Sequence, residues 1–249
     1  MGTSVDAEVA PGIRRLSGGI CNFYLVQDGG RCILIDAGTP GDWELLAAAL
    51  AGLGRSLDDL EAIVLTHAHS DHTGFAERAR TEAAATVWIN ADDERRAHGE
   101  TPAKNETGVA RYLLRLEAYR TLISLTRRGG AKIVPIAELS TFGDGETLDL
   151  PGRPRVVHTP GHTEGASVVL LEERKVVLTG DSLILRNPLT GRRGPQVMPS
   201  GLNVSTAQSL ASLDVIGALP ADLLLPGHGD PWTAGAAEAA RAAKAAGPS

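Results

Sequence analysis

Short apolar runs separated by turn residues occur along most of the chain, and this pattern predicts an α/β protein. Runs of strand length are found at residues 22–26, 32–35, 62–65, 86–89, 132–136, 146–150, 155–158, 166–171, 175–178 and 223–225. Helical spacing is found at residues 43–53, 73–82, 206–219 and 234–246, with Ser205 as a candidate N-cap. Because strands are followed by helices in each half, we expect two mixed sheets packed face to face with helices on their outer faces.

Residues from about 92 to 130 interrupt this alternation of short strands and helices with a separate helical pattern. Apolar side chains recur at helical spacing from Val109 to Arg128, which predicts one long helix with most of its arginines on the opposite face. Two interpretations stay open: the helix packs on a sheet with a solvated basic face, or it lies over the mouth of a site. We expect residues 1–249 to form a single domain with a helical insertion at about 92–130.

The composition narrows the classes of function. The chain has 249 residues with 24 basic and 30 acidic side chains, and this acidic balance argues against a nucleic-acid-binding surface. No apolar run approaches the roughly 20 residues of a membrane-spanning helix, and residues 1–12 lack the apolar core of a signal peptide. Cys21 and Cys32 are expected to be buried, reduced thiols. We expect a cytoplasmic protein that acts on a small molecule and binds neither nucleic acid nor membrane; a homodimer is one alternative for the oligomeric state.

A dense group of histidines follows the apolar run at residues 62–65. His67, His69, Asp71 and His72 lie close together in sequence, and Gly74 follows them after one residue. Side chains at the end of a buried strand project from a sheet edge, and packing gives no reason for three imidazoles and a carboxylate there. Neutral imidazole and carboxylate are ligands of zinc, and of iron or manganese in related sites. The alternative is a polar loop whose histidines have no shared role.

Three further candidate ligands follow later apolar runs in the same manner. His162 and His228 each end a Pro-Gly-His turn, and Asp181 directly follows residues 176–180. Glycine permits a sharp backbone turn beside a ligand, and proline restricts the direction of approach. Since these residues are far apart in the chain, they meet only if their strands lie side by side. That convergence is the central prediction.

The order of these motifs resembles the metallo-β-lactamase superfamily, whose fold is an αββα sandwich with its metal site along one edge of the two sheets. The resemblance extends from Asp36 to His228. It implies two divalent metal ions, zinc by preference, although iron and manganese accept the same ligands. It assigns the first ion to His67, His69 and His162 and the second to Asp71, His72 and His228, with Asp181 bridging the two. Asp36 would support a ligating imidazole rather than bind metal.

Within the superfamily, an acid in the bridging position of Asp181 resembles the ligand set of the glyoxalase II-like hydrolases. True metallo-β-lactamases have no acid at that position. The function this implies is hydrolysis of an ester, thioester or lactone bond of a small molecule, by a water that the two ions share and activate as hydroxide. Asp71 would have a catalytic role as well, because a water that it holds can serve the leaving group. The chain has no Gly-x-Ser-x-Gly motif, so a covalent serine mechanism has no support.

Other functions compete with this interpretation. A mononuclear iron site on the same fold would carry out persulfide dioxygenation, and a protein that kept the fold without catalysis would only bind its ligand. The complete ligand set favours an enzyme over a binding protein. Arg192 and Arg193 lie in a long irregular connection, residues 186–201, shortly after Asp181. They are expected to contact an anionic part of the substrate or, alternatively, to be solvated surface cations.

Overall fold

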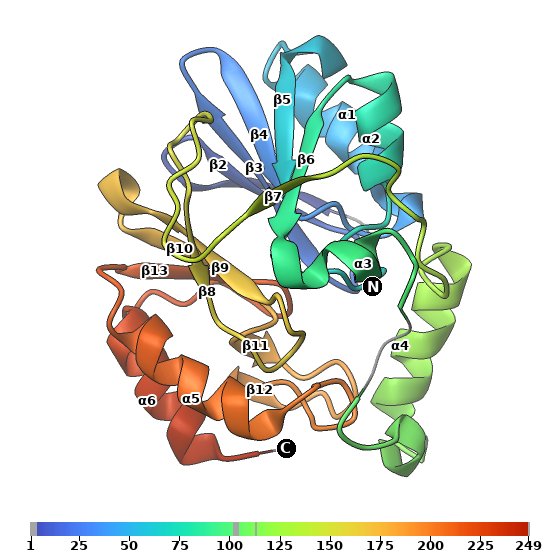
Figure 1. Cartoon of the computed structure of the whole chain (residues 1–249), viewed down its shortest axis with the longest axis vertical. Coiled ribbons are helices and arrows are strands. Elements are labelled where there is room, and N and C mark those ends of the chain that lie inside the picture. Colours follow the sequence, from blue (N-terminus) through green and yellow to red (C-terminus); the bar gives the residue numbers. More distant parts are fainter. Residues whose placement is uncertain (1–3, 102–104, 113, 249) are drawn as a thin grey trace.

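The larger of two facing sheets is mixed. The computed structural model describes residues 4–101, 105–112 and 114–248 (Figure 1). The seven strands of this larger sheet lie side by side in the order in which they occur in the chain. They are β1 (Ser4–Ala10), β2 (Ile13–Ser17), β3 (Asn22–Asp28), β4 (Arg31–Ile35), β5 (Leu60–Val64), β6 (Thr86–Asn90) and β7 (Ser140–Phe142). Strands β1 to β4 pair antiparallel, and β4 to β7 pair parallel.

The second sheet has four strands in the order β13-β10-β9-β8. They are β8 (Arg155–His158), β9 (Ser167–Leu171), β10 (Val176–Gly180) and β13 (Leu223–Pro226). β10 and β13 run parallel, whereas β9 runs antiparallel to both of its neighbours. A separate two-stranded sheet joins β11 (Ile184–Arg186) to β12 (Arg193–Gln196).

Helices cover the outer face of each sheet (Figure 1). α1 (Trp43–Gly52) and α2 (Ala76–Glu82) pack on the larger sheet, and α5 (Thr206–Gly217) and α6 (Ala236–Ala246) pack on the smaller one. α3 (Glu94–Ala97) and α4 (Leu116–Arg127) lie at one end of the sandwich, with α4 outside both sheets. Short 3-10 turns complete the chain: η1 (Pro40–Asp42), η2 (Leu57–Asp59), η3 (Ala91–Asp93), η4 (Val109–Tyr112) and η5 (Glu172–Arg174).

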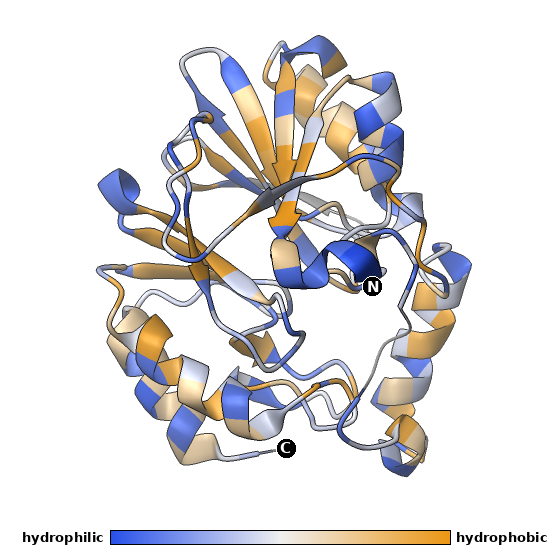
Figure 2. Ribbon diagram, viewed as in Figure 1, coloured by the Kyte–Doolittle hydropathy of each residue, from blue (hydrophilic) through white to orange (hydrophobic). Residues whose placement is uncertain are grey.

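Three apolar layers hold these elements together, which explains the continuous apolar runs of the central strands. Along β4, Leu34 packs beneath the helices while Ile33 and Ile35 face the second sheet. Along β10, Val177 packs beneath α5 and α6 while Leu178 faces the first sheet. Figure 2 shows these strands as the most hydrophobic part of the chain. Each such side chain contributes about 1.5–3 kcal/mol on burial. The expected sandwich of two mixed sheets with outer helices is confirmed.

Two of the strand predictions made from the sequence were wrong. Residues 132–136 form no strand, because Pro135 lacks the N–H that a ladder requires, and β7 pairs with β6 instead. Residues 146–150 form only an isolated bridge, Thr147 to Arg155. Pro154 accepts a hydrogen bond from the Leu148 N–H at 3.0 Å but has no N–H to return one.

The prediction of one long helix at 109–128 was also wrong in its bounds. The chain forms η4 and then α4, because Arg115 takes an extended conformation (φ −94°, ψ 128°) between them. Strands β1, β2, β7, β11 and β12 were not expected at all. By contrast, Ser205 caps α5 as expected, since its hydroxyl accepts from the Gln208 N–H at 3.3 Å. Cys21 and Cys32 are free and buried, as expected. Within the described residues, no helix is long and apolar enough to cross a bilayer.

Candidate metal centre

The predicted ligands follow the ends of strands that meet at one edge of the sandwich. β5 leads to His67, β8 to His162, β10 to Asp181 and β13 to His228. β4, β5 and β6 are parallel, as are β10 and β13, so the carboxyl ends within each sheet lie on the same side. The topology therefore brings together side chains that are far apart in sequence.

One group of three imidazoles forms the first cluster. His69 Nδ1 lies 2.8 Å from His162 Nε2, and His162 Nε2 lies 3.2 Å from His67 Nε2. One ring nitrogen from each residue therefore points at a common centre, in the arrangement of a three-histidine metal site. His67 and His162 are buried. The structure thus brings together all three residues assigned to the first ion.

The second cluster contains Asp71, His72 and His228. Asp71 Oδ2 lies 3.6 Å from His228 Nε2 and 3.9 Å from His72 Nε2. Both imidazoles are buried, whereas the Asp71 side chain is 18% exposed. Asp71 is thus the member of this cluster that solvent or a substrate reaches.

Asp181 lies between the two clusters. Its Oδ2 is 3.4 Å from His162 Nε2 in the first cluster and 3.3 Å from His228 Nε2 in the second. Its Oδ1 is 3.5 Å from His72 Nε2. A single buried carboxylate therefore faces both groups, which is the position of a ligand shared by two cations.

The chemistry of this donor set fits metal ions. Among the described residues, His72 Nε2, His228 Nε2 and Asp181 Oδ1 are buried without a hydrogen-bond partner, which is costly unless a cation takes that place. Burial lowers the pKa of His67, His69 and His162, so these three imidazoles are neutral as ligands must be. Burial acts in the same direction on His72 and His228, but the charge of Asp181 outweighs it and raises the pKa of both. Burial alone would raise the pKa of Asp181, but His228 and His72 outweigh it and lower that pKa well below its usual range. The Asp181 carboxylate is therefore ionised.

Asp36 holds His72 from the side opposite the cluster. Its Oδ2 lies 2.8 Å from His72 Nδ1, which leaves Nε2 to face Asp181. The same carboxylate accepts from the N–H and hydroxyl of Thr66, next to His67. Asp36 has φ +62°, a left-handed conformation that is strained for a non-glycine residue. The carboxylate is therefore held at this strand end despite the backbone cost.

Two further positioning residues were missed by the sequence analysis. Asp93 is buried in η3, where its carboxylate accepts from Ala68 N at 2.9 Å, from Thr163 Oγ1 at 2.7 Å and from Gly165 N at 3.0 Å. It therefore ties the His67–His69 loop to the turn that carries His162. Asn203 Oδ1 lies 3.2 Å from His162 Nδ1, which orients the Nε2 of that ring toward the cluster.

Replacing Asp93 with alanine is expected to weaken metal binding at the first cluster by about 10- to 100-fold, as for other residues that orient ligands. Three donors from two ligand loops would lose their acceptor, and each unsatisfied buried group costs about 1–3 kcal/mol. The measurement is metal titration by calorimetry together with the melting temperature. Asp92→Ala is the matched control, because the neighbouring Asp92 side chain is 64% exposed. Equal behaviour of the two variants would contradict the role of Asp93.

The glycines of the ligand turns allow close approach. A Cβ on Gly227 would lie 2.5 Å from Asp181 Oδ1 and 2.8 Å from His72 Cε1. Gly161 has φ +131°, and a Cβ there would lie 2.2 Å from the backbone nitrogen of Ser209 in α5. Both Pro-Gly-His turns therefore require glycine for reasons that the sequence pattern indicated.

The other predicted substrate residues lie elsewhere. Arg192 donates to the carbonyl oxygen of Ala246 at 3.4 Å, and Arg193 lies 3.7 Å from Asp230. Both side chains are exposed, and their contact with a substrate stays a prediction. The cluster side chains instead open into a cavity of about 320 Å³, whose wall includes Ala118, Leu122 and Leu125 of α4. α4 thus borders the cavity, and the interpretation that the insertion lies over the mouth of the site stays a prediction.

Residues 16–228 match the family model of the metallo-beta-lactamase superfamily. YobT of Bacillus subtilis is 31% identical over 166 residues, which cover 66% of this chain and 63% of YobT, less than two thirds of its length. The probable metallo-hydrolase YflN of the same organism is 25% identical over 251 residues, covering 91% of this chain and 87% of YflN. The atrochrysone carboxyl ACP thioesterase of Aspergillus fumigatus is 27% identical over 166 residues, covering 66% of this chain and 29% of that protein.

Among solved structures, the metallo-beta-lactamase family protein TTHA1429 from Thermus thermophilus is similar, with a TM-score of 0.67 and 25% identity. The alignment covers 93% of this chain and 77% of that one. The family model, the sandwich and the histidine and aspartate clusters at its edge all agree. The chain belongs to the metallo-beta-lactamase superfamily.

Proposed function

We propose that this chain is a metal-dependent hydrolase that holds two divalent metal ions and cleaves an ester, thioester or lactone bond of a small molecule. The observation that carries the proposal is the place of Asp181, whose buried carboxylate faces both clusters at 3.3–3.5 Å. A bridging acid of this kind favours the glyoxalase II-like branch. The thioesterase name of one relative supports the same reaction class.

Seven side chains would hold the ions. One ion would take a nitrogen from each of three histidines, the other would take two imidazoles and one carboxylate, and Asp181 would contact both: His67, His69, His162; Asp71, His72, His228; Asp181. When bound, such ions supply Lewis acidity that lowers the pKa of water and polarises a carbonyl group. Nitrogen and oxygen ligands suit zinc, and also iron and manganese.

The protein's own groups would orient the substrate and move the proton. Asp71 is the exposed acid of the site; its Oδ2 faces His72 and His228, so its other carboxylate oxygen would accept a proton from a held water and return it to the leaving group. Asp36 and Asn203 fix the rings of His72 and His162 from behind. With an acyl group bound, the apolar wall of the cavity would keep bulk water from the reacting atoms, which strengthens electrostatic interactions there.

Metal analysis of the purified protein, followed by a panel of esters, thioesters and lactones, tests this proposal. We expect about two equivalents of divalent metal per chain, as in two-metal hydrolytic sites, and turnover of at least one compound class. One iron per chain with persulfide-dependent oxygen uptake would replace the proposal with the dioxygenase alternative. A fully metal-loaded protein that binds compounds of the panel without turning any over would support a binding protein instead.

A further inference from the structure

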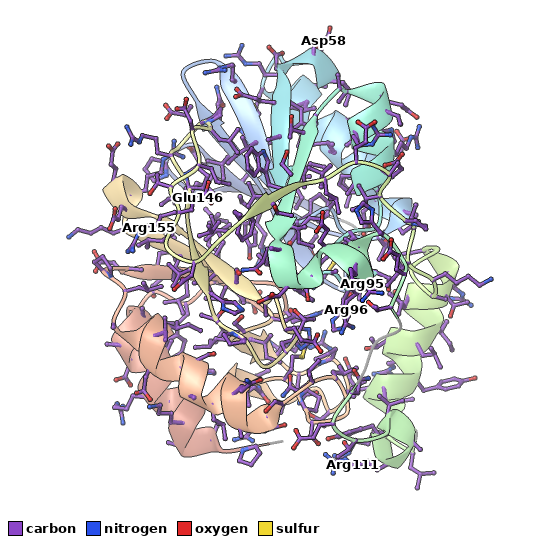
Figure 3. The ribbon with its side chains drawn as sticks, in the orientation of Figure 1. Asp58, Arg95, Arg96, Arg111, Glu146 and Arg155 are labelled. Carbon is purple, nitrogen blue, oxygen red and sulfur yellow. The ribbon has the colours of Figure 1, made fainter. Side chains whose placement is uncertain are left out.

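Two cavities of different character meet at the metal centre. The first, here called the acyl cavity, is the space of about 320 Å³ into which the clusters open. Besides cluster residues, its lining is largely apolar and includes Val109, Tyr112, Leu122, Leu125, Met198 and Leu202. Arg111 of η4, which is labelled in Figure 3, donates to Ser200 Oγ at 2.5 Å and so links η4 to the loop after β12. A cavity with this lining suits a hydrocarbon group.

The second cavity, here called the arginine cavity, has a volume of about 670 Å³ and lies along the other side of α4. Its lining includes the four arginines Arg120, Arg127, Arg128 and Arg186, and Glu117 is the acid among its described lining residues. Arg186 pairs with Glu117, and Arg128 pairs with the buried Asp42. Arg120 lies 3.8 Å from Glu117 and is 64% exposed. The positive charges exceed the negative ones, so this cavity attracts anions.

The two cavities share four lining residues, Ile20, Thr121, Pro188 and His228. Thr121 Oγ1 donates to the Pro188 carbonyl at 2.7 Å, which fixes α4 to the loop after β11 at this boundary. His228 is a member of the second cluster and faces Asp71 and Asp181. The predicted reaction centre therefore borders both the apolar space and the basic one.

We propose that the substrate is a linear ester or thioester with an apolar acyl group on one side of the scissile bond and a phosphate-type anion on the other. This inference rests on the proposed hydrolase function and names its substrate class. The acyl group would lie in the acyl cavity and the anion in the arginine cavity. Hydrolysis adds the oxygen of water to the acyl carbon, breaks its bond to sulfur or oxygen, and yields a carboxylate, a thiol or alcohol, and one proton.

The acyl cavity is tested with uncharged thioesters of N-acetylcysteamine of increasing chain length. We expect kcat/KM to rise about fourfold per CH2 from acetyl to hexanoyl, because each buried methylene contributes a roughly constant increment. Leu122→Asn should flatten this dependence, since Leu122 lines the cavity. Leu116→Asn is the control, because Leu116 is 63% exposed on the same helix outside that lining. A rate independent of chain length in the unaltered protein would overturn the acyl assignment.

The arginine cavity is tested by comparing hexanoyl-coenzyme A, a phosphate-bearing thioester, with hexanoyl-N-acetylcysteamine. We expect the ratio of their kcat/KM values to favour the phosphate-bearing probe and to fall by about five- to tenfold in the double variant Arg120→Gln, Arg127→Gln, as for two exposed charge contacts. Added salt should lower the ratio in the unaltered protein. Arg115→Gln, an exposed arginine outside the lining, should keep it.

The outcomes separate this inference from the proposed function. Hydrolysis of thioesters with equal rates on both probes, or an unchanged ratio in the double variant, would overturn the anion assignment while leaving the hydrolase intact. Faster turnover of lactones than of any linear compound would overturn the linear substrate class. Absence of turnover on every compound by metal-loaded protein would instead contradict the hydrolase itself.

Discussion

Replacing Asp181 with asparagine is expected to lower kcat/KM by about a hundred- to a thousandfold, the range observed when one group that stabilises reaction charge is removed. Asparagine keeps the shape of the side chain but removes the negative charge that faces His162, His228 and His72. Two cations close together would then share one fewer anionic ligand, so at least one of them should bind more weakly. The measurements are kinetics on the best substrate of the panel and metal content after dialysis.

Asp214→Asn is the matched control for this variant. The Asp214 side chain is 75% exposed in α5, where it pairs with Lys244 away from both clusters. It should leave metal content and kcat/KM unchanged. An Asp181→Asn protein that retains full metal content and full activity would show that Asp181 bridges nothing.

Removing metal with a chelator is expected to abolish activity and to lower the melting temperature by roughly 5–10 °C. A ligand present at about 100 times its dissociation constant adds about 2.7 kcal/mol to folding stability, and a domain of this size loses about 2–4 °C per kcal/mol. The physical reason is that His72 Nε2, His228 Nε2 and Asp181 Oδ1 would lie buried without partners. Differential scanning calorimetry with and without chelator measures the shift.

Re-addition of zinc to the stripped protein should restore both the melting temperature and the activity. The variant His69→Ala provides the comparison, since its first cluster has lost a ligand and its response to chelator should be smaller. A melting temperature that chelator leaves unchanged in the unaltered protein would contradict the view that ions occupy these clusters.

The candidate ligands were predictable because each carries its signal locally. An apolar run, a Gly or Pro turn and a ligand-type side chain stand within a few residues of one another at His162, Asp181 and His228. The structure brings these residues together with His67 and His69, as the sequence analysis expected; the binding of metal there stays a prediction. The sandwich of two sheets was predictable for a similar reason. Both faces of its central strands are buried, so these strands appear in the sequence as continuous apolar runs.

The residues that orient the ligands were not predictable in this way. Asp93 contacts Ala68 across 25 residues, and Asn203 contacts His162 across 41 residues, without a local pattern at either end. The strand β2 was missed because Arg14 and Arg15 separate its apolar positions Ile13 and Leu16. Long-range hydrogen bonds and irregular edge strands depend on tertiary contacts that spacing alone does not encode.

For the helical insertion, the sequence pattern predicted the two faces of the helix but not what they contact. Periodicity in 109–128 identified an apolar face and an arginine face, yet it left open what either face contacts. In the structure Leu122 and Leu125 border the acyl cavity, Arg120, Arg127 and Arg128 border the arginine cavity, and Leu116 and Tyr119 are exposed. A helix with two contrasting faces has the same sequence pattern whether its partner is a sheet, solvent or a bound compound.

α4 contributes to both cavities but supplies none of the seven candidate ligands, which come from loops after the strands of the two sheets. It is joined to the rest of the chain by a few contacts, among them Glu117 with Arg186 and Thr121 with Pro188. On the proposed function, selectivity would lie in this helix and reactivity in the ligand loops, which are separate stretches of the chain. Substitutions confined to this helix would then redirect the proposed hydrolase to new compounds while its candidate metal ligands stay unchanged.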